Sequence, residues 1–149
     1  MHIVHHTLEL PTDSGIEIYD LTPRIREKVA TFCTTTGASN GQVLVFSKHT
    51  TTALAINEYE ARLLDDLKVW LKTIAPPTGS YRHNDLHLRD VPPDEPINAH
   101  SHLMAIALSN HETIPLVDGE LALGQWQSVL FFELDGPRQR SVSLQIWGV

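Results

Sequence analysis

The sequence has little cysteine and none of the features of an export signal. Cys33 is its single cysteine, so no intrachain disulfide can form, and the opening residues MHIVHHTLEL lack a basic start and a long apolar segment. We therefore expect a cytoplasmic protein. Cys33 follows Ile25, Val29 and Phe32 at helical spacing, which favours a packing role over a nucleophilic one.

Basic residues and long hydrophobic runs are also scarce. The chain has 11 lysines and arginines against 18 acidic residues, and its formal net charge is −7. This balance disfavours broad binding to nucleic acid or to an anionic membrane, because both require clustered basic side chains. No apolar run approaches the roughly 20 residues that cross a bilayer. The sequence therefore predicts neither a nucleic-acid partner nor a membrane partner.

A length of 149 residues encloses one hydrophobic core, so we predict a single domain over residues 1–149. Alternating or continuous apolar segments predict strands, and apolar spacings of three and four predict helices. The result is an α+β fold with about seven strands and three helices, whose largely antiparallel sheets form a sandwich or a partly open barrel. The predicted strands cover residues 2–10, 16–21, 42–47, 127–135 and 139–147, with a hairpin over 113–124, and the predicted helices cover 23–33, 57–74 and 99–110.

Local signals position these elements. The turn TDSG joins the first two strands in a predicted hairpin. Thr22 before Pro23 predicts a helix N-cap, and Asn57 with Glu60 predicts a second capping arrangement. Asn98 is expected to cap the third helix, which is apolar almost throughout and is therefore expected to be buried.

Two segments are candidates for binding or catalysis. SKHTTTAL, residues 47–54, leaves an apolar strand through a histidine and three hydroxyls instead of the Gly, Pro, Asn or Asp of an ordinary turn. The other segment is the loop over residues 76–98, whose length without regular structure favours a functional role. Both lie at element boundaries, where binding side chains commonly converge.

The chain has nine histidines, which differ in their surroundings. Ordinary positions on a strand or beside a helix C-terminus explain His2, His5, His6 and His111. The other four histidines, His49, His83, His100 and His102, lie at the ends of predicted strands and helices or in loops. Neutral imidazole at such positions is able to bind zinc, nickel, iron or copper. The spacing of these four is too wide for a local metal signature, so it leaves metal binding open.

His100 and His102 point to roughly opposite sides of a helix, so only one of them easily enters a given site. The first turn of that helix would offer the N–H groups of Ala99, His100 and Ser101 to a phosphate or a carboxylate. With the hydroxyls of residues 50–52 nearby, a metal and an anion would share one pocket. The alternative for the threonines is a strand end whose hydroxyls face water.

The segment HTTTALAINEYE resembles the His-Thr-Thr/Ser-Ala-x-x-x-x-Asn-Glu block of the YjbQ family, also called UPF0047 or secondary thiamine-phosphate synthase. YRHND, NAHSHL, LVDGELALGQWQ and FFELDGPRQR resemble its remaining blocks in the same order, over nearly the whole chain. The resemblance implies a small α+β subunit that assembles as a homotrimer and holds a divalent metal on three histidines. Zinc is the favoured metal, and magnesium is the alternative if a phosphate bridges it.

The resemblance also implies residue roles. The metal ligands carried over by position are His49, His83 and His102. Glu58 and Asp85 are the candidate catalytic residues, although Glu58 also suits the first turn of a helix, and Asp85 also suits a turn or the orientation of His83. The candidate substrate and phosphate ligands are Thr50, Thr51, Asn57, Ser101 and Gln127.

Four further positions bear on the ligand and on assembly. Thr52 stands where the family commonly has alanine or serine, and Gln125 where threonine is usual, which puts the ligand preference in question. Trp126 is expected in the core or at a subunit interface. Arg138 is expected either in solvent or near an anion across a subunit boundary.

The activity implied by the resemblance joins a hydroxymethylpyrimidine diphosphate to a thiazole phosphate with release of pyrophosphate. A metal and a helix N-terminus would stabilise the departing pyrophosphate, and the thiazole nitrogen attacks without a strong protein base. Two alternatives stay open. One is zinc-dependent hydrolysis of a small phosphorylated metabolite, with Glu58 or Asp85 handling the proton, and the other is non-catalytic binding of a metal or phosphate ligand.

Overall fold

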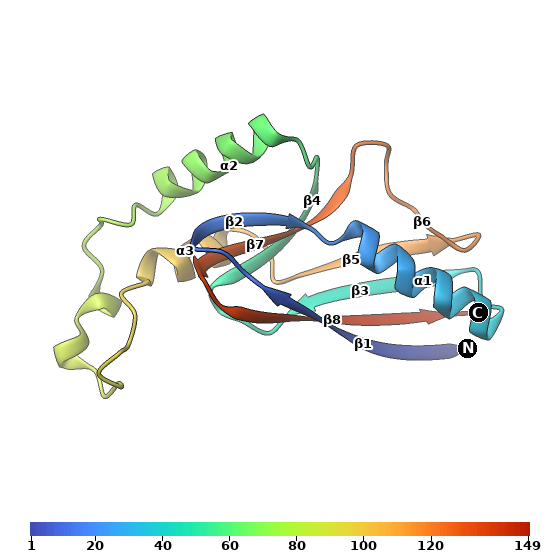
Figure 1. Ribbon diagram of the computed structural model, residues 1–149, viewed down its shortest axis with the longest axis horizontal. Coiled ribbons are helices and arrows are strands. Elements are labelled where there is room, and N and C mark those ends of the chain that lie inside the picture. The colour runs from blue at the N-terminus through green and yellow to red at the C-terminus, as the bar shows by residue number, and fades with distance from the viewer.

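The computed structural model describes residues 1–149, with eight strands, three α-helices and two short 3-10 helices (Figure 1). The strands form two antiparallel sheets, in the orders β1-β8-β3-β5-β6 and β2-β7-β4, which curl into a half-barrel. The predicted α+β fold is confirmed, and none of its helices combines the length and apolar character of a membrane span. The elements are β1 (His2–Pro11), β2 (Gly15–Asp20), α1 (Thr22–Thr36), β3 (Gly41–Ser47), β4 (Thr52–Asn57), α2 (Ala61–Ile74), η1 (Arg82–Asn84), η2 (Leu86–Leu88), α3 (Ala99–Ala107), β5 (His111–Val117), β6 (Glu120–Leu121), β7 (Ser128–Gly136) and β8 (Gln139–Gly148).

The larger hydrophobic core packs α1 against both sheets. Helical spacing places Ile25, Val29 and Phe32 on one face of α1, and all three are buried. They belong to a cluster of 17 buried residues that also draws on β3, β5, β7 and β8. Gly37 ends α1 in the left-handed conformation, at a φ of 74°, which glycine adopts at little cost.

β7 is the central strand of the three-stranded sheet and is covered on both faces. Its side chains alternate, so that Val129 and Phe131 join the larger core while Leu130 and Phe132 join a second cluster of eight buried residues. Leu71 of α2 and residues of α3 complete the second cluster. Cover on both faces explains why the sequence of β7 is a continuous apolar run.

The predicted hairpin between the first two strands is wrong. β1 pairs along its ten residues with β8, whereas β2 pairs with β7 in the other sheet. β1 pairs with β8 along ten residues, whereas β2 has only six residues with which it could pair. The larger number of cross-strand pairs favours the sheet that contains β8. The segment between β1 and β2 is therefore a crossing from one sheet to the other.

One strand, β4, is not predicted by the sequence pattern. β4 pairs with β7 from Thr52 opposite Glu133 to Asn57 opposite Ser128. Its sequence TALAIN contains two alanines, which are depleted in strands, and lacks a clear alternation of polar and apolar residues. Residues 48–51, between β3 and β4, are thus a second crossing between the sheets.

Two predicted helix caps are also wrong. Thr22 already lies within α1, where its Oγ1 accepts a hydrogen bond from the Val129 N–H at 2.8 Å. Asn57 is the last residue of β4, and the N-cap of α2 is Glu60, whose carboxylate accepts from two N–H groups of the first turn. Glu60 therefore supplies the acceptor that the sequence analysis assigned to Asn57.

α3 is shorter and more exposed than predicted. It ends at Ala107, and the side chains of Leu103 and Ile106 are 45% and 79% exposed. His111 begins β5 and so does not directly follow α3, which ends at Ala107. Trp126 is 68% exposed and so is not a core residue. These apolar side chains lack cover within the chain.

Candidate functional site

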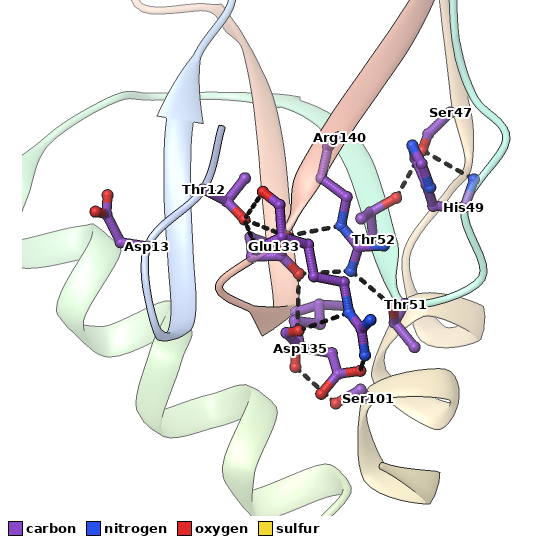
Figure 2. A network of polar contacts seen from close by, with 12 residues as sticks. Thr12, Asp13, Ser47, His49, Thr51, Thr52, Ser101, Glu133, Asp135 and Arg140 are labelled. Carbon is purple, nitrogen blue, oxygen red and sulfur yellow. Dashed lines mark hydrogen bonds and ion pairs between the residues drawn. The ribbon is translucent and has the colours of Figure 1, made fainter. Parts of the chain in front are cut away.

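Hydroxyl groups build the corner between β3 and β4. β3 ends at the buried Ser47 and β4 begins at the buried Thr52, whose side-chain oxygens lie 2.6 Å apart (Figure 2). Ser47 Oγ also accepts from the His49 N–H at 3.4 Å. These bonds hold the corner without glycine or proline, so serine and threonine at this position have a structural role.

The ring of His49 is held against β8. The Ser141 N–H donates to His49 Nε2 at 3.1 Å. A ring nitrogen that accepts a hydrogen bond carries no proton, so the imidazole is neutral with its proton on Nδ1. Burial, followed by the nearby Arg140 guanidinium, lowers the pKa of His49 below its ordinary value. His49 therefore offers an N–H donor to the site and carries no charge at neutral pH.

His102 and His83 contribute a second pair of rings to the site. The two rings pack edge to face with their centres 4.8 Å apart, His102 coming from α3 and His83 from η1 in the long loop. Burial first, and then repulsion from His83, lowers the pKa of His102. His102 lines three separate hollows, whereas His100 lines none of them, as expected for residues on different sides of a helix.

Two cavities meet at a shared wall formed by His49, Thr50 and His102. The first, which we call the apolar-walled cavity, has a volume of about 450 Å³ and continues along Ala105, Ile106 and Leu108. The second, the polar cavity, has a volume of about 410 Å³ and no hydrophobic residue among its 11 lining residues. Its charged lining residues are Lys48, Glu95, Asp135, Arg138 and Arg140.

Glu133 and Arg140 form a buried ion pair (Figure 2), and Arg140 lines the polar cavity. Arg140 Nε and Nη2 donate to the two carboxylate oxygens of Glu133 at 2.7 and 2.8 Å. The same carboxylate accepts from Thr12 Oγ1 at 2.6 Å and from the Asp135 N–H at 2.8 Å. Burial alone would raise the pKa of Glu133, but these hydrogen bonds outweigh it and lower the pKa. The ionised carboxylate fixes the Arg140 guanidinium in one orientation.

This network leaves several donors of the polar cavity free. Arg140 Nη2 also donates to Thr51 Oγ1 at 2.8 Å, so the hydrogen of the Thr51 hydroxyl is left to donate elsewhere. Arg140 Nη1 makes no hydrogen bond within the chain, and the exposed Lys48 forms no ion pair. The other charged groups of the cavity are paired, Arg138 with Asp135 at 2.7 Å and Glu95 with Arg89 at 3.2 Å.

The three histidines predicted to bind a metal do not form a coordination group. No cluster of three or more His, Cys, Asp or Glu side chains is placed to hold a metal ion. His83 and His102 are neighbours, but the Nε2 lone pair of His49 is occupied by the Ser141 N–H and its Nδ1 carries the proton. A histidine ligand needs a free lone pair, so these side chains as placed do not fit a three-histidine centre.

The family assignment rests on nearly the whole chain. Residues 6–149 match the family model described as UPF0047 protein YjbQ-like. The chain belongs to the YjbQ/UPF0047 family. It is 37% identical over 148 residues to a UPF0047 protein of Methanothermobacter thermautotrophicus. This alignment covers 99% of this chain and 94% of that relative. A YbjQ-like protein of unknown function from Sulfolobus solfataricus P2 superimposes with a TM-score of 0.86, at 31% identity and over 99% of both chains. A hypothetical protein from Aeropyrum pernix K1 superimposes with a TM-score of 0.84, at 34% identity and over 98% of this chain and 99% of that one.

In this YjbQ-like chain, part of the predicted site comes together. Thr50 and Thr51 line the polar cavity beside His49 and His102. His83 lines an adjoining hollow of about 290 Å³ that His102 also borders. Ser101 does not face any of these cavities, because it is fully buried and its Oγ donates to the Leu134 carbonyl at 2.6 Å.

The other predicted site residues lie elsewhere. Asn57, Glu58 and Gln127 line a separate hollow of about 240 Å³ beside Trp126. This hollow is at the far end of β4, and six strand residues span roughly 17 Å, so Glu58 does not reach a ligand at His49 within one chain. Asp85 contributes its backbone to the consecutive turns η1 and η2.

Hydrogen bonds within the chain occupy two of the three N–H groups that were predicted to bind an anion at the start of α3. The Ala99 N–H donates to Asn84 Oδ1 at 3.2 Å, and the Ser101 N–H donates to the Asn98 carbonyl at 2.9 Å. These two N–H groups already have partners and are not available to a phosphate, whereas the His100 N–H makes no hydrogen bond within the chain. The side chain of Asn98 makes no cap and donates through Nδ2 to Asp135 Oδ2 at 2.8 Å.

Sequence reasoning missed Arg140, Glu133 and Asn98 as site residues. A signal was present for the ion pair, because Glu133 interrupts an apolar run in a buried strand and an isolated carboxylate there requires a partner. Arg140 follows a tight turn on the next strand and is the nearest buried cation. Asn98 was interpreted only as a helix cap, which concealed its place in the polar cavity.

Proposed function

We propose that this protein acts on a small phosphorylated molecule bound across the wall that the two cavities share. The observation that carries this proposal is the adjacency of a polar cavity with unpaired donors and a cavity with an apolar wall, both bounded by His49, Thr50 and His102. A ligand with a phosphate group at one end and an organic ring at the other matches this division.

The phosphate end of the ligand would bind among the donors that have no partner in the chain. These are the Lys48 ammonium, Arg140 Nη1 and the hydroxyl hydrogen of Thr51. Hydrogen bonds from charged donors to phosphate oxygens are among the stronger ones, and a guanidinium already fixed by Glu133 loses little entropy on binding. Lys48 supplies the unpaired positive charge.

The reaction we propose joins a hydroxymethylpyrimidine diphosphate to a thiazole phosphate, as in secondary thiamine-phosphate synthase. The bond between the pyrimidine methylene carbon and the diphosphate oxygen breaks, and its electron pair leaves with pyrophosphate. The thiazole nitrogen forms the new carbon–nitrogen bond with its lone pair. Lys48, Arg140 and Thr51 would stabilise the charge that develops on pyrophosphate, while neutral His49 acts as an N–H donor. No protein base is required.

We further propose that the protein is a homotrimer in which a second copy covers the apolar wall. Ile106 lines the apolar-walled cavity yet is 79% exposed, and Leu103 on the same helix is 45% exposed. Exposed apolar residues on a cavity wall are typical of a surface that a partner covers. A closed ring of copies would exclude water from the cavity.

The test is to supply both substrates to purified protein and to measure thiamine phosphate and pyrophosphate together. Lys48→Gln and Thr51→Val are each expected to lower kcat/KM by about tenfold or more, since each removes one bond to the phosphate. Lys72→Gln and Thr31→Val, on exposed helix faces, serve as controls and should keep the parent activity. Saturable binding of the diphosphate without product would show that the protein binds this ligand but does not catalyse the reaction. Equal losses of activity in the controls would show that the effects of Lys48→Gln and Thr51→Val are not specific to the polar cavity.

A further inference from the structure

The loop between β6 and β7 ends in a closed turn, residues 124–127, that holds a tryptophan in solvent (Figure 1). The Gly124 N–H donates to Gln127 Oε1 at 2.8 Å, and the Gln127 N–H donates back to the Gly124 carbonyl at 3.0 Å. These two bonds fix the turn, yet the side chain of Trp126 within it is 68% exposed. A large aromatic side chain on a fixed turn is typical of an interface anchor, because it loses little entropy when a partner binds.

Polar groups without partners lie beside Trp126, since Asn57, Glu58 and Gln127 line the same hollow. Asn57 Oδ1 accepts from the Glu58 N–H at 2.8 Å, and Gln127 Oε1 accepts from the Gly124 N–H. Their oxygens are used, so both amides keep an NH₂ group that is free to donate. The Glu58 carboxylate forms no ion pair. The hollow thus combines an aromatic ring, two amide donors and an unpaired carboxylate.

The apolar-walled cavity has the complementary features. Ile106 on its wall is 79% exposed, Leu103 on the same helix is 45% exposed, and the unpaired Lys48 lines the adjoining polar cavity. A closed ring of three copies joins two different surfaces of the chain at every contact. The Trp126 hollow and the α3 face are two such surfaces, with exposed apolar side chains on both and unpaired charges of opposite sign.

We propose that the 124–127 turn of one copy packs on the Leu103 and Ile106 face of the next copy, which brings Glu58 of the first copy to the ligand held at His49 of the second. This inference rests on the proposed function, because it uses the trimer and the ligand proposed there. Within one chain the whole length of β4 separates Glu58 from His49. Each site is therefore completed by a carboxylate of the neighbouring copy.

A carboxylate at this place has a role in the proposed reaction. When the bond to the diphosphate oxygen breaks, its electron pair leaves with pyrophosphate and positive charge develops on the pyrimidine methylene carbon. Glu58 of one copy stabilises this positive charge, while Lys48 and Arg140 of the other copy stabilise the negative charge on pyrophosphate. The two charges that form in the transition state are thus stabilised from opposite sides of the subunit boundary.

Cysteine cross-linking tests the contact without any assay of activity. In Ile106→Cys/Gln125→Cys a short bis-maleimide should link copies into dimers and trimers on a denaturing gel. Each single variant should give only monomers, which also controls for Cys33. Val69→Cys/Ile106→Cys, with its second thiol on the exposed face of α2, is the matched control and should give no linked copies. Linked copies in Ile106→Cys alone, or none in Ile106→Cys/Gln125→Cys, would overturn the inference.

Co-expression of two impaired variants tests the role of Glu58. Lys48→Gln and Glu58→Gln are each expected to lower kcat/KM by about tenfold or more. In mixed trimers one site in four combines an intact Lys48 with an intact Glu58 from the neighbouring copy, so about a quarter of the parent activity should return. Activity of the mixture at the average of the two variants would overturn the inference and leave the proposed function standing. A parent that gives the cross-links but no thiamine phosphate would refute the proposed reaction, and with it this role of Glu58, while supporting the contact.

Discussion

The Glu133–Arg140 pair allows one stability prediction to be worked through from the structure. In Arg140→Ala the Glu133 carboxylate, which is fully buried, loses both bonds from the guanidinium and keeps those from Thr12 and from the Asp135 N–H. Without Arg140 an ionised Glu133 carboxylate would be a buried charge with no partner, so the carboxylate takes up a proton. At 1.36 kcal/mol per unit, protonation at pH 7 of a carboxyl with an ordinary pKa of 4.5 costs about 3.4 kcal/mol. With the lost packing of the arginine, we expect a total loss of roughly 3–5 kcal/mol at pH 7.

The pH dependence separates this explanation from a simple cavity effect. In the parent the pKa of Glu133 is lowered, so its contribution to stability is present above the ordinary pKa and is lost as the pH falls through the folded value. In Arg140→Ala the folded pKa is raised instead. The difference in unfolding free energy between parent and variant should therefore shrink on going from pH 7 to pH 5, by up to about 1.4 kcal/mol per unit.

Urea unfolding followed by tryptophan fluorescence, at one protein concentration and at pH 5, 6 and 7, measures this difference. The double variant Glu133→Gln/Arg140→Ala removes the charge, and its deficit relative to the parent should lose that steep dependence. A deficit of Arg140→Ala below about 1 kcal/mol at pH 7 would contradict the buried pair. A deficit of the single variant that stays constant with pH would refute the protonation argument.

Two further predictions concern the metal and the assembly. Any zinc that the protein retains after desalting is expected to depend on His83 and His102, because His49 has no free lone pair. Elemental analysis should therefore find zinc kept in His49→Gln and lost in His102→Gln. Loss of zinc in His49→Gln alone would contradict the hydrogen bond from the Ser141 N–H to His49. Light scattering should find the parent at three times the subunit mass of 16.7 kDa and Ile106→Asp as a smaller species, because aspartate on a buried interface is left without a partner. Lys72→Gln is the control for assembly, and a monomeric parent would contradict the proposed trimer.

The sequence was informative wherever the cause of structure is local. The apolar spacing of α1 and α2 and the continuous run of β7 depend on residues close together in the chain, so these elements could be predicted. The pairing of β1 was not predictable in this way. Its partner β8 lies at the other end of the chain, and a short connection to β2 is compatible with either sheet.

The same distinction between local and long-range causes applies to the candidate site. Resemblance to the family blocks placed His49, His83 and His102 in one region, and the structure brings them to one end of the fold. What each ring does depends on contacts between distant residues. The tautomer of His49 follows from the N–H of a residue 92 positions away, and the ionisation of Glu133 depends in part on Thr12, which is 121 positions away. No pattern within a single segment contains that information.

The end of the half-barrel at which the site forms has a physical explanation. The chain passes between the two sheets three times there, in the segments 12–14, 48–51 and 137–138. Backbone and hydroxyl groups at such crossings lie outside the ladders and need other partners. Glu133 and Arg140 supply them, since the carboxylate binds Thr12 and the guanidinium binds Thr51 (Figure 2). A pair of charges that stabilises the crossings also carries spare donors, because only three of the five N–H groups of the Arg140 guanidinium donate to Glu133 and Thr51. The polar cavity is therefore a consequence of how the two sheets are joined, and the ligand we propose would complete the hydrogen bonds that the crossings leave open.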